Sequence, residues 1–76
     1  MKLIHDPASV WPTQMVDGYP FGVESIGPRD HVVFRLWGSR RIYLRDQGFI
    51  SRAQAAAYLE PIVKNYKNSI IVAVSA

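Results

Sequence analysis

Hydrophobic and polar residues alternate most clearly on either side of Gly38 and Ser39. The run before this pair, residues 31–37, is rich in β-branched and aromatic side chains, and the run after it, residues 41–45, alternates polar with apolar residues. Two such runs around a Gly-Ser pair predict a β-hairpin.

Two loop lengths are open for this hairpin. A two-residue loop, with Gly38 at the positive φ of a type II′ turn, pairs Phe34 with Tyr43. A longer loop, of about three or five residues centred on positions 38–40, pairs Phe34 with Leu44 and gathers the aliphatic side chains on one face. The burial pattern favours the longer loop, and the inner face would then consist of Val32, Phe34, Leu36, Ile42 and Leu44.

The outer face of that register carries arginines that alternate with aromatic rings. Guanidinium groups bind carboxylate or phosphate, and Trp, Tyr and Arg are enriched in the hot spots of protein interfaces. Arginine stems that simply lie over rings on a solvated face would give the same pattern. The residues predicted to bind a partner are Arg35, Trp37, Arg40, Arg41, Tyr43 and Arg45.

One helix is predicted, over residues 52–66. Ser51 and Gln54 have the form of a capping box, and apolar residues follow at helical spacing. Pro61 is expected to kink or break the helix, because proline removes a backbone hydrogen bond. Lys64 and Lys67 near the end of the helix are explained by its dipole.

Further strands are predicted at residues 21–26 and 70–74, and a short one at residues 2–5. The continuous β-branched run at 70–74 is typical of a strand buried on both faces, and with residues 41–45 and the helix it would form a β-α-β crossover. Residues 1–20 are otherwise expected to be a mostly irregular arm.

These elements predict an α+β fold as a single domain over residues 1–76. The sheet would be mixed or antiparallel, with about three to five strands and the helix packed on one face.

The net charge of +3 is unevenly distributed along the 76 residues. Residues 1–28 hold one basic and three acidic residues, whereas residues 29–76 hold eight basic and three acidic residues. The basic part can attract acidic proteins, nucleic acid or anionic lipid. No apolar run approaches the roughly 20 residues of a membrane span, and the chain has no cysteine, so we expect a cytoplasmic protein that does not bind membranes.

Catalytic and metal-binding motifs are not found in the sequence. Without cysteine, thiol catalysis and cysteine-ligated metal sites are excluded. His5 and His31 match no metal-ligand spacing, and the six acidic residues are scattered. We therefore expect no catalytic residue, no metal site and no cofactor; the best enzyme alternative is a metal-free ribonuclease that uses His31 with the hairpin arginines.

The segment from Gly48 to Val74 resembles the helix–strand halves of sporulation-related peptidoglycan-binding repeats, in which Phe and Ser precede an alanine-containing helix and a valine-rich strand follows. The second β-α-β copy of those repeats is missing from this chain, so the resemblance implies no function for it.

The functional expectation is a small, non-enzymatic protein-binding domain that acts through the basic and aromatic sheet face. Phages and mobile elements encode small cysteine-free proteins of this kind as inhibitors or accessory proteins that block a host factor. The alternative is a module that binds single-stranded nucleic acid on the same face, and a steep salt dependence would distinguish it.

Overall fold

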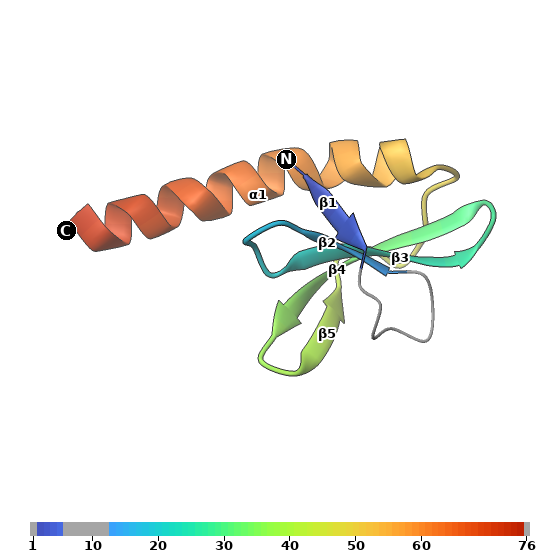
Figure 1. Cartoon of the computed structure of the whole chain (residues 1–76), viewed down its shortest axis with the longest axis horizontal. Coiled ribbons are helices and arrows are strands. Elements are labelled where there is room, and N and C mark those ends of the chain that lie inside the picture. The colour runs from blue at the N-terminus through green and yellow to red at the C-terminus, as the bar shows by residue number, and fades with distance from the viewer. Residues whose placement is uncertain (1, 6–12, 76) are drawn as a thin grey trace.

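The computed structural model describes residues 2–5 and 13–75, with side chains described as far as Asn68. Within these residues the chain forms one antiparallel sheet in the order β1-β2-β3-β4-β5, with a single helix across one face (Figure 1). The elements are β1 (Leu3–His5), β2 (Thr13–Val16), β3 (Phe21–Gly27), β4 (Asp30–Trp37), β5 (Arg40–Tyr43) and α1 (Arg52–Ser75). The predicted α+β class, with a helix packed on a sheet, is confirmed.

The helix begins where the sequence predicts. The hydroxyl of Ser51 accepts a hydrogen bond from the backbone N–H of Gln54 at 3.2 Å, which makes Ser51 the N-cap. Ala55, Leu59 and Val63 recur at helical spacing and are buried against β3 and β4. The core on this side of the sheet comprises Val16, Phe21, Val23, Val33, Ala55, Leu59 and Val63.

The helix does not end where the sequence predicts. It runs as one element through Pro61 to Ser75. Of the expected kink or break at Pro61, the break is therefore wrong, and so is the expected strand at residues 70–74. Pro61 cannot bond to the carbonyl of Ala57, but both residues are exposed, so water can satisfy that carbonyl.

Residues 70–74 are helical although four of the five are β-branched. Isoleucine and valine cost only a few tenths of a kcal/mol relative to alanine in a helix. A strand, by contrast, needs a neighbouring edge with which to pair, whereas a helix satisfies its own backbone groups. Without this strand there is no β-α-β crossover, and every strand pair in the described sheet is antiparallel.

The length of α1 exceeds that of the sheet beneath it. Its 24 residues correspond to about 36 Å, and its C-terminal part extends past the sheet in Figure 1. Over the described residues no helix combines the length and the apolarity that crossing a membrane requires.

Strand β1 lies within the short strand predicted at residues 2–5, whereas β2 forms from residues that were expected to be mostly irregular. Thr13–Val16 pairs with β1 on one side and β3 on the other. A turn at Gly18, with φ of 79°, leads into β3. Residues 6–12 of the predicted arm, between β1 and β2, lie outside the described residues.

The β4–β5 hairpin has the two-residue loop, so the predicted longer loop is wrong. Trp37 pairs with Arg40, and Phe34 pairs with Tyr43. Gly38, the first central residue of the turn, has a positive φ of 63°, whereas Ser39, the second, does not have a positive φ. This combination is that of a type II′ turn.

The physical reason for this register is that the centre of the sheet is buried on both faces. The consecutive residues Val33 and Phe34 are 1% and 0% exposed. Val33 faces α1, and Phe34 therefore lies on the opposite face, because successive strand residues alternate. The expected inner face is split accordingly: Val32, Phe34 and Leu36 lie opposite the helix, whereas Ile42 and Leu44 lie on the helix side.

Candidate functional site

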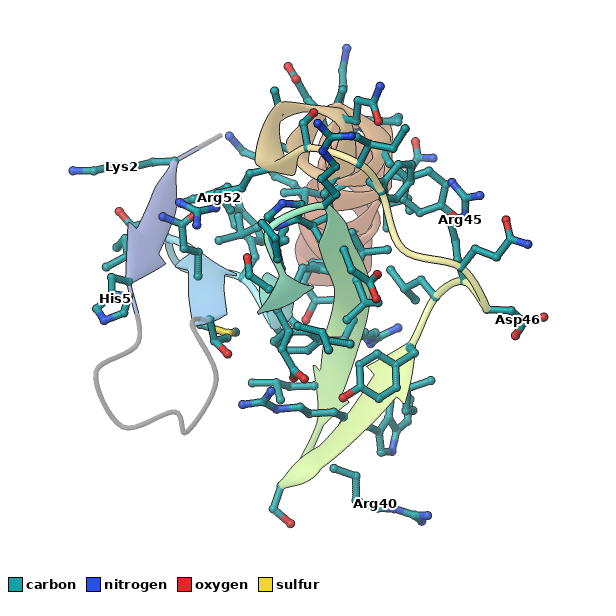
Figure 2. The ribbon with its side chains drawn as sticks, turned by 90° about the vertical axis from the view of Figure 1, so that its right-hand side faces the viewer. Lys2, His5, Arg40, Arg45, Asp46 and Arg52 are labelled. Atoms are coloured by element: carbon teal, nitrogen blue, oxygen red, sulfur yellow. The ribbon has the colours of Figure 1, made fainter. Side chains whose placement is uncertain are left out.

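The six residues predicted to bind a partner do not share one face. The register places Arg35, Trp37 and Arg40 on the helix side of the sheet, and Arg41 and Tyr43 on the opposite side. Arg45 follows the end of β5. Figure 2 shows Arg40 at the turn end of the hairpin and Arg45 at the other end of β5, nearer to the helix. The predicted single basic and aromatic face is therefore wrong as a geometric arrangement.

On the helix side, the guanidinium group of Arg35 lies among three aromatic rings. Its central carbon is 4.7 Å from the ring centroid of Trp37, 5.3 Å from that of Tyr66 and 5.8 Å from that of Phe21. The Nε atom of Arg35 is buried without a hydrogen-bond partner, and within the described residues Arg35 forms no ion pair. These rings hold the cation in place by cation–π attraction, and no carboxylate among the described residues compensates its charge.

Two large apolar side chains are exposed beside Arg35. Trp37 is 61% exposed and Ile42 is 48% exposed. Ile42 is the cross-strand partner of Arg35, and Arg40 is the partner of Trp37, so these residues form one contiguous block on the hairpin. We name this block the hairpin patch, and it consists of Arg35, Trp37, Arg40 and Ile42.

Ile42 is the member of the hairpin patch that sequence reasoning missed. The longer loop assigned it to the core, next to Leu44. The signal that could have found it is the turn chemistry of Gly38-Ser39, since a two-residue loop places Ile42 opposite Arg35.

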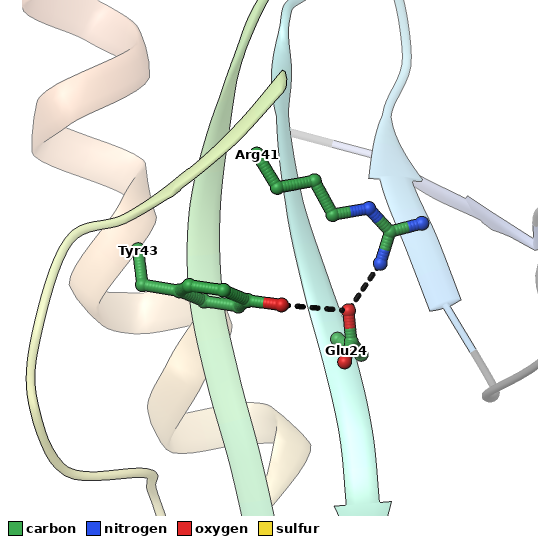
Figure 3. Close-up of polar contacts among 3 residues, drawn as sticks. All are labelled: Glu24, Arg41 and Tyr43. Carbon is green, nitrogen blue, oxygen red and sulfur yellow. Dashed lines mark hydrogen bonds and ion pairs between the residues drawn. The ribbon is translucent and has the colours of Figure 1, made fainter. Parts of the chain in front are cut away.

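On the opposite face, Arg41 and Tyr43 are engaged with Glu24 of β3. Figure 3 shows the guanidinium group of Arg41 in an ion pair with the Glu24 carboxylate, and the Tyr43 hydroxyl donates to the same oxygen at 3.3 Å. Glu24 is only 6% exposed. Arg41 also lies 4.8 Å above the ring of Phe34, and Tyr43 meets that ring edge to face at 6.4 Å. These contacts cover the buried Phe34 and span β3, β4 and β5, so both side chains have a structural role.

Arg45 also covers apolar surface. Its guanidinium carbon lies 4.4 Å from the ring centroid of Phe49 and 5.6 Å from that of Tyr58 in α1. It therefore packs over the segment that joins the hairpin to the helix, away from the hairpin patch.

A Ser–His contact lies at the other end of the sheet. Ser25 Oγ and His31 Nδ1 are 2.7 Å apart, and His31 is 7% exposed. The hydrogen bond satisfies a buried ring nitrogen next to the bulge at the end of β3. In the described part of the chain, no group of three or more His, Cys, Asp or Glu residues could hold a metal ion.

Comparison of the chain with protein-family models, with curated proteins and with solved structures finds no match.

Proposed function

We propose that this chain is a small, non-enzymatic protein-binding domain and that the hairpin patch is its binding surface. The observation that carries the proposal is the exposure of Trp37 and Ile42 side by side, with the uncompensated cation of Arg35 between the ring and the helix. Exposed apolar groups that gather next to arginine are typical of interface hot spots, whereas single exposed apolar residues are ordinary.

The composition of the hairpin patch supports binding without catalysis. Its four residues offer no carboxylate, imidazole, hydroxyl or thiol that could act as an acid, a base or a nucleophile. Trp37 and Ile42 offer apolar area, and Arg35 offers a guanidinium that is already held in position, which lowers the entropic cost of binding. That the domain blocks a host factor, as a phage-encoded inhibitor would, stays a prediction.

A protein partner is favoured over single-stranded nucleic acid. A track of stacked bases needs aromatic rings and unpaired cations along one face. Here Arg41 is paired with Glu24, Arg45 lies over the rings of Phe49 and Tyr58, and Tyr43 lies on the opposite face from Trp37.

The test is a selection of displayed natural protein fragments on the purified domain, followed by measurement of their Kd values. Trp37→Ala is expected to weaken the selected binders at least about tenfold, because truncating a central aromatic anchor removes a hot spot. The matched control is Ile50→Ala, since Ile50 is an equally exposed apolar residue (65%) outside the hairpin. Binders that depend on Ile50 and tolerate Trp37→Ala would refute the proposal.

A second titration separates the nucleic-acid alternative. Single- and double-stranded oligonucleotides are added at two salt concentrations while tryptophan fluorescence is recorded. The proposal expects no binding even at low salt. Binding that weakens steeply with salt and is lost in Arg35→Ala would establish the alternative instead, because phosphate contacts release counterions.

A further inference from the structure

We infer that the binding mode is strand addition: β5 accepts an extended, acidic segment of the partner protein as a sixth strand of the sheet. This inference rests on the proposed function, and it names the chemistry and the conformation of the partner.

The hydrogen-bond phase of the hairpin determines which groups of β5 are available. The N–H of Leu44 donates to the carbonyl of Val33 at 3.0 Å. In an antiparallel pair the bonded residues recur every second position, so Arg40 and Ile42 also bond inwards to β4. The N–H and C=O groups of Arg41 and Tyr43 consequently point away from β4.

That outer edge of β5 is uncovered in the described part of the chain. β5 is the last strand of the sheet, and all four of its residues are exposed. The other end of the β4 edge is closed, because His31 and Phe49 exchange two backbone hydrogen bonds of 2.9 and 2.7 Å. On this side of the sheet, the free edge in the described chain is thus confined to β5, directly beside the hairpin patch.

Charge selects the strand that can pair there. Residues 35–45 contain four arginines and no acidic residue. Positive charge along an edge opposes pairing with a second copy of the same edge, and it favours a strand that carries carboxylates.

The two faces of β5 select an alternating pattern in the incoming strand. Its side chains that lie on the helix side would meet Arg40, which has no carboxylate partner in the described chain, and they would be acidic. Those that lie on the opposite face would meet the exposed ring of Tyr43, because Arg41 on that face is already paired with Glu24, and they would be apolar. A partner segment of alternating acidic and β-branched residues fits both conditions.

The probe for this inference is a blocked hexapeptide of alternating glutamate and valine, with a lysine–valine hexapeptide as the charge-reversed control. Each is titrated into the ¹⁵N-labelled protein and followed by amide NMR. The acidic peptide is expected to give saturable shifts along β5. It should slow hydrogen exchange of the Arg41 and Tyr43 amides at least about fivefold and leave the Ile42 amide unchanged, because only the first two gain a partner. The lysine peptide should do neither.

A backbone variant separates the edge from its side chains. The chain of 76 residues is synthesised chemically with an N-methyl group on Tyr43, which removes an outward N–H and breaks no hydrogen bond to β4. We expect that this protein no longer binds the acidic peptide. A control protein with the N-methyl group on the exposed residue Gln47 should still bind it. Amide spectra of the two proteins without peptide establish that both are folded.

The outcomes distinguish this inference from the proposed function. Equal binding of the lysine peptide, unchanged exchange at Arg41 and Tyr43, or retained binding by the N-methyl-Tyr43 protein overturns strand addition; if fragment binding still requires Trp37, the proposed function stands. Dimerisation of the protein through β5 in solution would also overturn it, because a second copy would then be the occupant. Fragment binding that is indifferent to Trp37→Ala refutes the proposed function itself.

Discussion

Gly22 is the second residue of β3, where the ring of Phe34 lies against the backbone, and a methyl group has no room there. A Cβ atom on Gly22 would lie 2.6 Å from Cζ of Phe34, 2.9 Å from Sδ of Met15 and 2.8 Å from the backbone oxygen of Gln14. Carbon atoms in contact are normally about 3.5–4.0 Å apart, so Gly22→Ala demands a shift of roughly 1 Å.

The neighbours of Gly22 have little freedom to make that shift. Phe34 is 0% exposed and is covered by Arg41 and Tyr43, and the oxygen of Gln14 belongs to the adjacent strand. Overpacking of this kind costs about 1–3 kcal/mol. The lower entropy of the unfolded chain returns about 0.4–1 kcal/mol when glycine becomes alanine. We therefore expect Gly22→Ala to lower the free energy of unfolding by about 1–2 kcal/mol.

Thermal and urea unfolding followed by circular dichroism measure this loss. In a domain of this size, 1 kcal/mol corresponds to about 4–8 °C in Tm. Gly27→Ala in the same strand is the matched control, because its Cβ would meet only Cβ of Asp30, at 3.9 Å. That variant should be as stable as the original protein or slightly more stable.

A double variant tests the cause of the effect. Phe34→Leu removes the ring atom that the new methyl group would strike. Gly22→Ala combined with Phe34→Leu should then be less destabilised than the sum of the two single variants, by about 0.5–3 kcal/mol. Equal stability of Gly22→Ala and Gly27→Ala, or strict additivity with Phe34→Leu, would refute the packing described for this face.

Two further predictions concern the same face of the sheet. Phe34→Ala should lower the free energy of unfolding by about 3–5 kcal/mol in a urea titration, since the ring is fully buried, and a loss below 1 kcal/mol would contradict its burial. Arg41→Ala should lower the free energy of unfolding by about 1–3 kcal/mol, because among the described contacts the buried Glu24 carboxylate then keeps only the Tyr43 hydroxyl. The control is Arg40→Ala, which removes an exposed arginine at the turn and should leave the free energy of unfolding nearly unchanged. Equal stability of the two variants would count against the contacts of Glu24 with Arg41 and Tyr43.

The role of Arg41 illustrates where sequence reasoning stopped. From the sequence, Arg41 is an outward-facing arginine of the predicted partner-binding face. The structure pairs it with Glu24, which is 17 positions earlier in the chain. No local pattern links these two residues, because they are brought together only by two successive strand pairings, β3 with β4 and β4 with β5.

Local signals were sufficient for several elements of the fold. Ser51 begins the helix, the spacing of Ala55, Leu59 and Val63 identifies its buried face, and the Gly38-Ser39 pair marks the turn between β4 and β5. Each of these features depends on residues that are close to one another in the sequence. The interactions that produce it, which are capping, turn geometry and helical periodicity, also act between these near neighbours.

The tertiary structure decided the rest. The sheet buries its centre on both faces, so Val33 and Phe34 are both core residues, and the assumption of one clean face failed. That assumption displaced Ile42 into the core and placed Arg35 and Arg41 on one surface, whereas the observed register separates them and exposes Ile42 beside Trp37. The sequence by itself determined the helix start, the turn and the basic character of the hairpin. Only the packing of side chains from distant strands decided which arginines of the hairpin are engaged and which are left to meet a partner. The physical reason is that burial on both faces of the sheet removes the alternation of apolar and polar residues from which the register is predicted.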